Sequence, residues 1–183
     1  MEPSCAARSA RLASMAQLPS LPKSFSRIDL EALGFDGWCT WAALRQADFA
    51  AVPAGPAAYV IYRAAGTAPP FSGVNPGGRF KDKDPSVPLD VLTSSWVAGA
   101  HVVYIGKADI ADRRLKQFAR FGAGEPVGHW GGRFIWQLSD WDELLVAWHA
   151  ISWVEQAREY EKRLLVRFAK LHGGVRPFAN LTG

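Results

Sequence analysis

Four stretches of mostly apolar residues predict the strands of a small sheet. Residues 58–63 and 101–106 are rich in Tyr, Val and Ile, which suit a pleated and buried surface. Residues 133–138 and 144–151 have the same character, and the polar segment between them predicts a turn. The strands are separated by helical or irregular segments. We therefore expect an α+β fold with a small mixed or antiparallel sheet flanked by helices.

Two longer stretches predict helices, because their apolar residues recur at three- and four-residue spacing. Asp109 is expected to begin the first helix, which continues to Phe121 and ends at Gly122 and Gly124. The second helix is expected over residues 154–171, where a pair of glycines follows. These are the longest helices that the pattern predicts.

The chain before the first strand predicts a helical N-terminal extension over residues 25–55. Ser26 has the side chain of an N-cap for a short helix that ends at Gly34, and Thr40 is the expected N-cap of a second short helix. After the first strand, residues 65–90 are rich in proline, glycine and charge and predict a long irregular insertion. Such a segment inside a domain is more often functional or mobile.

Glu161 is a charged residue at an apolar position of the last predicted helix. At about 100° per residue it falls inside the apolar stripe, close in angle to Val154 and Phe168. A carboxylate on a core-facing stripe is costly unless it is paired or binds a metal. The alternatives are a partly exposed glutamate at the margin of the helix and a glutamate paired with a buried arginine.

The same test separates the two arginines of the earlier helix. Arg114 falls between Phe118 and Phe121 on the inward side, whereas Arg113 falls on the opposite face. An arginine at the edge of a core can bind a phosphate through its two-pronged guanidinium, or pair with a buried carboxylate. Periodicity leaves both roles open.

The predicted strands and helices carry several short motifs along the chain. The first strand carries a short motif ending in Tyr59, and the second carries Tyr-Ile-Gly-Lys-Ala beginning at Tyr104. Arg114 follows ten positions after that tyrosine, and Glu161 precedes leucines three and four residues on. The chain closes on Pro-Phe-Ala-Asn ending at Asn180. Read in order, these features resemble the GIY-YIG nuclease superfamily, and Asn180 is similar to its supporting asparagine.

The resemblance covers about residues 56–180 and implies a GIY-YIG-like nuclease domain over 56–183. The sequence departs from the family pattern in three places. Ala57 and Ala58 replace a glycine and an isoleucine, and Phe118 stands where the family often has a tyrosine or histidine. The third departure is the insertion, because the family's connection between these strands is usually short.

The resemblance implies a metal-dependent endonuclease that hydrolyses DNA phosphodiester bonds with one Mg²⁺ or Mn²⁺ ion. Glu161 would hold the metal, and Arg114 would neutralise charge on the phosphate. Tyr59 would orient or deprotonate the attacking water, with Tyr104 helping to position it. Asn180 would brace the site.

Further candidates come from the strand end, the insertion and a glycine-rich phrase. Lys107 could lower the pKa of the first tyrosine, and its alternative is a solvated surface lysine. Arg79 and Lys81 could contact DNA from the insertion, which could equally be an elaboration without function. His129 could contact phosphate or shuttle a proton, and Trp130 could stack on a base. The alternative for these two is a glycine-bounded turn.

Net charge changes this picture only slightly. A formal charge of +4 and a pI of about 9.3 suit a polyanionic partner without requiring one. The modest charge and the loss of a polar residue at position 118 motivate a second hypothesis, a catalytically weak or inactive nucleic-acid-binding module of the same fold. The sequence leaves open RNA as the substrate, the specificity and the oligomeric state.

The remaining composition bears on location. Cys5 and Cys39 form no disulfide framework or zinc spacing, which suits a reducing cytoplasm. No run reaches the roughly 20 apolar residues of a membrane span. Residues 1–24 are expected to be a disordered tail, in which either Met1 or Met15 is the true start.

Overall fold

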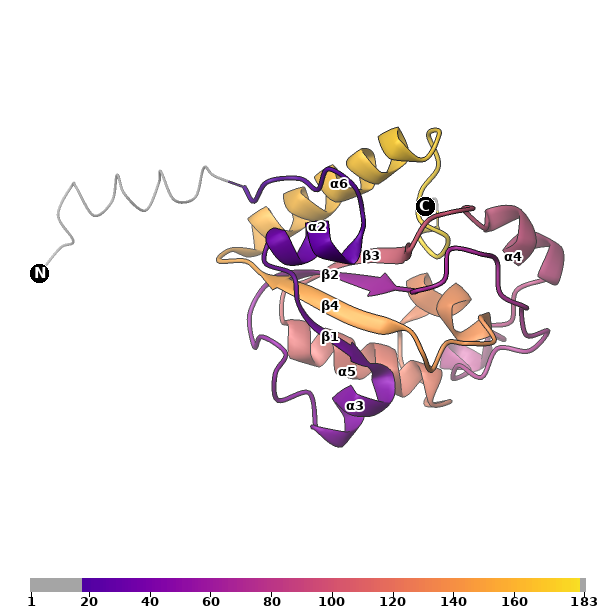
Figure 1. The fold of residues 1–183 in the computed structure, drawn as a ribbon. Coiled ribbons are helices and arrows are strands. Elements are labelled where there is room, and N and C mark those ends of the chain that lie inside the picture. The colour runs from indigo at the N-terminus through magenta and orange to yellow at the C-terminus, as the bar shows by residue number, and fades with distance from the viewer. Residues whose placement is uncertain (1–17, 182–183) are drawn as a thin grey trace, which may run out of the picture.

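The computed structural model describes residues 18–181, and a four-stranded antiparallel sheet lies between two helical layers (Figure 1). The strand order is β1-β4-β2-β3. The strands are β1 (Asp36–Thr40), β2 (Ala57–Tyr62), β3 (Val102–Ala108) and β4 (Leu145–Ala150). The helices are α2 (Arg27–Ala32), α3 (Trp41–Gln46), α4 (Leu89–Ser95), α5 (Ala111–Gly122) and α6 (Val154–Leu171), with 3₁₀ helices η1 (Phe80–Asp82) and η2 (Trp130–Gln137). The predicted α+β class and helix-flanked antiparallel sheet are confirmed.

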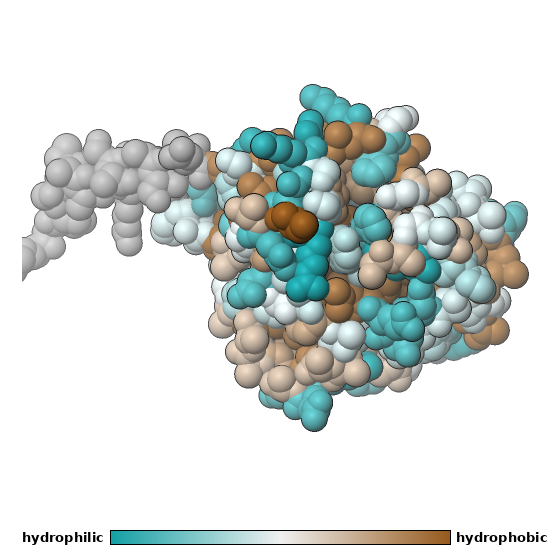
Figure 2. Space-filling view, viewed as in Figure 1, coloured by the Kyte–Doolittle hydropathy of each residue, from teal (hydrophilic) through white to brown (hydrophobic). Residues whose placement is uncertain are grey.

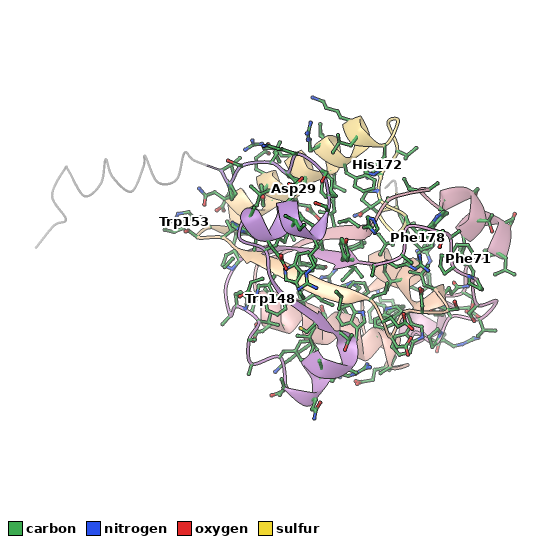
Figure 3. The ribbon with its side chains drawn as sticks, in the orientation of Figure 1. Asp29, Phe71, Trp148, Trp153, His172 and Phe178 are labelled. Atoms are coloured by element: carbon green, nitrogen blue, oxygen red, sulfur yellow. The ribbon has the colours of Figure 1, made fainter. Side chains whose placement is uncertain are left out.

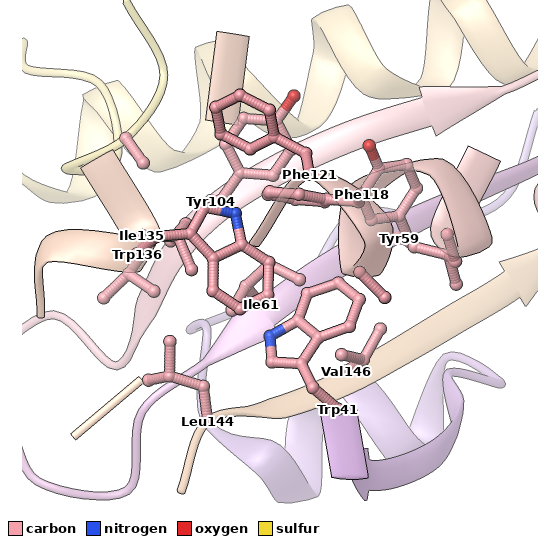
Figure 4. Packing of buried hydrophobic residues seen from close by; sticks show 14 of the residues in the cluster. Trp41, Tyr59, Ile61, Tyr104, Phe118, Phe121, Ile135, Trp136, Leu144 and Val146 are labelled. Carbon is pink, nitrogen blue, oxygen red and sulfur yellow. The ribbon is translucent and has the colours of Figure 1, made fainter. Parts of the chain in front are cut away.

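Strand β2 runs through the centre of the molecule and has no exposed residue. Its alternating side chains enter two cores, Tyr59 and Ile61 on one face and Ala58 and Val60 on the other. The first core lies under α3, α5 and η2 and is dominated by aromatic rings, many of them drawn in Figure 4. The second core lies under α2 and α6. The sheet is therefore buried on both faces.

The N-terminal extension contains both predicted helices, and their caps are formed as expected. The Ser26 hydroxyl accepts a hydrogen bond from the Asp29 backbone at 3.3 Å, and the Thr40 hydroxyl accepts one from Ala43 at 3.3 Å. Between them the chain forms β1, which the sequence pattern did not predict, and β1 pairs with β4. The extension is thus part of the sheet.

Strand β1 was not predicted from the sequence because its backbone is irregular. Gly37 and Trp38 have left-handed φ values of 98° and 47°, and the pairing register shifts between Asp36 and Cys39. A five-residue strand with this bulge has no clean alternation of apolar and polar residues. The strand prediction for residues 133–138 was wrong, because residues 133–137 lie in η2 and only Leu138 forms a β-bridge, to Phe71.

The 3₁₀ helix η2 forms because glycine lets it pack against α5. A Cβ atom at Gly132 would lie 2.3 Å from the ring of Phe118, so only glycine allows this approach. Three successive residues of η2, Phe134, Ile135 and Trp136, are all buried. A continuous apolar run of this length cannot be assigned to strand or helix by periodicity.

The insertion is irregular but anchored. Buried Gln137 donates hydrogen bonds to the carbonyls of Ser72 and Val87, and its side-chain oxygen accepts one from the Val87 backbone. Phe71 stacks on Phe178 with ring centroids 5.7 Å apart, and the two lie together in Figure 3. The insertion therefore packs on the domain and ends in α4.

The first described residues pack on α6. The Tyr160 hydroxyl donates to the Ser20 carbonyl at 3.0 Å, and Arg167 donates to the Pro22 carbonyl at 2.8 Å. Residues 18–24, predicted to belong to a disordered tail, are thus held in place because polar groups of α6 bind their backbone. Residues 1–17, including the choice between two starting methionines, lie outside the described residues.

Helices in the described part of the chain are all too short or too polar to cross a bilayer. On the face drawn in Figure 2, hydrophilic groups of residues alternate with smaller apolar patches.

Candidate active site

The two motif tyrosines lie side by side over Gly106. Tyr59 pairs directly with Gly106 across the β2–β3 ladder, and Tyr104 lies two residues away on the same face of β3. Their ring centroids are 5.9 Å apart. A Cβ atom at Gly106 would lie only 2.5 Å from the Tyr59 ring and 2.8 Å from the Tyr104 ring. Glycine is therefore required for both rings to cover this strand.

The hydroxyl groups of this pair occupy one edge of the aromatic cluster (Figure 4). The Tyr59 hydroxyl is buried and forms no well-aligned hydrogen bond to the residues that the structure describes. Burial raises the pKa of Tyr59 well above its usual value, and Tyr104 raises it further, whereas the nearby Arg114 guanidinium lowers it. Burial also raises the pKa of Tyr104. Both side chains are neutral phenols at neutral pH.

The positive charge of Arg114 acts on both tyrosines and on two further titratable groups. It lies on α5, half-buried, and donates a hydrogen bond to Gln117 at 3.3 Å. Its guanidinium is close enough to influence the pKa values of both tyrosines, His129 and Glu161. The inward orientation predicted from periodicity is thus observed.

Glu161 approaches the open edge of β3 from α6. Burial raises the pKa of its carboxyl, and this effect outweighs the opposing influence of the Lys107 ammonium and of the nearby Lys107 backbone N–H. Arg114 and Arg158 oppose it further. The carboxylate is half-buried and lies among cations, so the alternative of a partly exposed glutamate at the margin of the helix stays open.

Asn180 binds the same strand edge. Its side-chain oxygen accepts from the Ile105 backbone N–H at 2.8 Å, and its amide nitrogen donates to the Ile105 carbonyl at 2.7 Å. The backbone of Ala179 donates to the Val103 carbonyl at 2.9 Å. The C-terminal segment therefore satisfies the free backbone groups of β3, as a further strand would, and fixes the strand that carries Tyr104 and Lys107.

An open depression of about 470 Å³ lies where β3 meets α5. Its wall includes the cations Lys107, Arg113 and Arg114 together with the exposed side chain of Ile110. Lys107 also pairs with Asp109 at 2.6 Å, so Asp109 binds this lysine instead of capping α5. Neither motif tyrosine is among the lining residues. The depression offers positive charge beside the buried phenols.

The donor set suits a divalent cation that shares its ligands with a phosphate. No group of three or more His, Cys, Asp or Glu side chains forms a metal cage within residues 18–181. Mg²⁺ commonly takes only one or two protein carboxylates and completes its coordination with water and substrate phosphate. The single carboxylate of Glu161 fits such an ion and does not fit a closed structural site.

Phe118 and His129 form a buried pair next to the tyrosines. Their rings stack with centroids 3.8 Å apart, and Phe118 also meets the Tyr104 ring edge to face at 5.7 Å. His129 is 1% exposed, and neither ring nitrogen has a hydrogen-bond partner among the described residues. Burial, and then Arg114, lower its pKa well below the usual value. His129 therefore lies beneath the surface and not where a phosphate would touch it directly.

The other predicted substrate contacts lie on the surface. Arg79 is paired with Asp84 at 2.7 Å, and Lys81 holds its ammonium 5.5 Å from the Phe80 ring. Trp130 is partly exposed. These residues belong to the insertion and to η2, so they are set apart from the Tyr59–Arg114–Glu161 group.

Sequence reasoning missed two cations near these sites. Arg133 places its guanidinium 4.9 Å from the Trp130 ring centroid, because a 3₁₀ helix brings residues three apart to one face. The predicted strand over residues 133–138 gave no reason to expect Arg133 beside Trp130. Arg113 was set aside because it points away from the core, although an outward arginine can line a surface depression.

No known protein family model matches the chain, and neither a curated protein nor a solved structure is significantly similar to it. Function is therefore inferred from the geometry of these residues.

Proposed function

We propose that this protein is a Mg²⁺- or Mn²⁺-dependent endonuclease that hydrolyses phosphodiester bonds in DNA. The observation that carries the proposal is the position of Arg114. One guanidinium lies within electrostatic range of two buried phenols and of a half-buried carboxylate, and it opens onto a cationic depression. Perturbed titratable groups gathered next to a surface depression are typical of catalytic sites.

The chain's own residues would bind and orient the phosphate. Arg114 presents a planar set of donors that matches two phosphate oxygens, and Lys107 adds a second positive charge on the same wall. Both charges would stabilise the extra negative charge that develops on the phosphate during hydrolysis. Glu161 would hold the metal ion, which polarises the scissile phosphate and stabilises the leaving oxygen when bound.

Tyr59 has a narrower role here than the resemblance suggests. Its raised pKa makes the phenolate inaccessible, so this side chain orients the attacking water by hydrogen bonding and does not deprotonate it. Its hydroxyl forms no well-aligned hydrogen bond among the described residues, although Tyr104 and Arg114 lie near enough to compete for that bond. Tyr104 packs against the same ring and holds it in place.

The reaction is a simple hydrolysis. The water oxygen forms a bond to phosphorus, and the bond from phosphorus to the leaving ester oxygen breaks with its electron pair. One proton of the water passes to solvent, and the leaving oxygen takes a proton from solvent. The products are a phosphate monoester and a free hydroxyl.

A second function, a nucleic-acid-binding module without efficient cleavage, is favoured by one observation. Glu161 lies among Lys107, Arg114 and Arg158, so its charge can be neutralised by ion pairing without a metal. A buried carboxylate held in this way would be structural.

Metal titration with matched variants separates the two functions. Glu161→Gln removes the carboxylate, whereas Glu159→Gln changes an exposed glutamate on the same helix. The endonuclease proposal expects Mn²⁺ binding and DNA cleavage to be lost in Glu161→Gln and kept in Glu159→Gln. Cleavage that persists in Glu161→Gln contradicts the assignment of the metal ligand, and DNA binding without cleavage by wild type supports the binding module.

A further inference from the structure

Two partly exposed aromatic rings, each with a cation close to its face, form a distinct surface. Phe80 is 36% exposed and has the Lys81 ammonium 5.5 Å from its ring centroid. Trp130 is partly exposed and has the Arg133 guanidinium 4.9 Å from its ring centroid. We call these four residues the aromatic–cation patch.

The two halves of the patch come from different segments that the fold brings together. The insertion is fixed by the Gly78 backbone, which donates to the Phe121 carbonyl at the end of α5 at 2.9 Å. The Phe80 ring then packs against Gly128, where a Cβ atom would be 3.6 Å away. Trp130 follows Gly128 by two residues, so both rings belong to one region of the surface.

Two buried rings connect the patch to the motif tyrosines. His129 lies between Gly128 and Trp130 in sequence and is buried, stacked on Phe118. Phe118 in turn contacts Tyr104. The patch therefore lies on the same side of the sheet as the tyrosines, although it is set apart from them.

The backbone at the tip of the insertion holds an uncommon conformation. Lys81 and Asp82 have left-handed φ values of 55° and 59°, which non-glycine residues adopt at a cost. This conformation places the Lys81 ammonium by the Phe80 ring, which remains accessible.

The tip of the insertion carries little net positive charge for a surface that would hold duplex DNA by its phosphates. Arg79 is paired with Asp84, and Lys81 and Lys83 flank Asp82. A duplex is bound mainly through phosphate contacts, and its bases are stacked on one another. Unpaired bases expose their faces and stack on aromatic side chains regardless of sequence.

We propose that the aromatic–cation patch binds unpaired nucleotides of the DNA substrate by stacking on Phe80 and Trp130. Lys81 and Arg133 then contact the phosphates of the same strand. The proposal rests on the proposed function and narrows its substrate to DNA that contains a single-stranded segment.

Binding can be tested apart from cleavage, in EDTA, by fluorescence anisotropy of a labelled oligonucleotide with the full chain. Phe80→Ala and Trp130→Ala are each expected to weaken binding of single-stranded DNA by about 5- to 150-fold, the range for losing one stacked base. Trp38→Ala is the matched control, because Trp38 has the Arg27 guanidinium 5.0 Å from its ring but belongs to the opposite core. This variant should bind as wild type does. Thermal melting confirms that each variant is folded.

Three results would overturn the inference: tighter binding of duplex than of single-stranded DNA, equal binding by all three variants, or binding confined to RNA of the same sequence. A failure of the patch and a failure of the proposed function give different results. If wild type binds by stacking but does not cleave DNA, the patch is supported and the proposed nuclease activity is refuted. If wild type cleaves DNA, and Phe80→Ala and Trp130→Ala change neither cleavage nor binding, the nuclease activity is supported and the patch is refuted.

Discussion

Gly106→Ala should damage both the stability and the proposed activity of this protein, for a reason that can be measured from the structure. The added Cβ would lie 2.5 Å from Cζ of Tyr59, 2.7 Å from its hydroxyl oxygen and 2.8 Å from a ring carbon of Tyr104. Carbon atoms pack at about 3.5–4.0 Å, so both rings must move by about 1 Å. The rings are rigid and nearly fully buried, and Phe118 packs against Tyr104.

The expected cost in the free energy of unfolding is about 1–3 kcal/mol, the usual penalty for an extra methyl group in a packed core. If the tyrosine hydroxyls serve catalysis, a displacement of about 1 Å would also lower the cleavage rate by about 100-fold. Urea unfolding measures the first effect and plasmid nicking the second.

Gly73→Ala is the matched control, because a Cβ there meets nothing within 4 Å. Its stability and activity should equal those of wild type. If Gly106→Ala unfolds at the same urea concentration as Gly73→Ala, the packing argument for the Tyr-Ile-Gly motif is refuted.

Three further predictions concern neighbouring groups. Glu161→Gln should melt at a higher temperature than wild type at about pH 8, because burial raises the pKa of Glu161 and so destabilises its charged form. The difference in melting temperature should vanish as the pH falls below the ordinary carboxyl pKa of 4.5, where both side chains are neutral. A wild type that is more stable than Glu161→Gln at about pH 8 would contradict this prediction. Asn180→Ala leaves the Ile105 N–H and carbonyl unpaired, so urea unfolding should show a loss of about 1–3 kcal/mol in the free energy of unfolding; Asn180→Asp, whose second oxygen would face the Ile105 carbonyl without a hydrogen to donate, should lose at least as much. Phe118→Ala removes a fully buried ring and should cost about 3–5 kcal/mol in the same assay; a loss below about 1 kcal/mol would show that the aromatic core is not packed as described.

The elements with clear local signals could be predicted from the sequence. The bounds of α6 agree with the prediction because a long 3.6-residue pattern ends at two glycines, and Ser26 and Thr40 cap their helices through short-range hydrogen bonds. Elements that depend on contacts between segments far apart in the sequence could not be predicted in this way. Strand β1 depends on pairing with β4, and η2 depends on Phe118 packing against Gly132, so neither leaves a periodic pattern.

The candidate site divides in the same way. Helix periodicity alone turned Arg114 and Glu161 toward the core side of their helices, and the structure has both half-buried. The burial of His129 was not foreseeable, because it depends on a ring from α5 that lies eleven residues earlier in the chain and stacks on it. The pairing of Arg133 with Trp130 follows from a 3₁₀ helix that the sequence pattern presented as a strand.

The most direct test of the central proposal is nicking of supercoiled plasmid in Mg²⁺ or Mn²⁺ by wild type, Glu161→Gln and Glu159→Gln prepared side by side. The proposal predicts nicked circles with wild type and Glu159→Gln, and none with Glu161→Gln. Equal nicking by all three would contradict the role of Glu161, and plasmid bound but left intact by wild type would replace the endonuclease with a binding module.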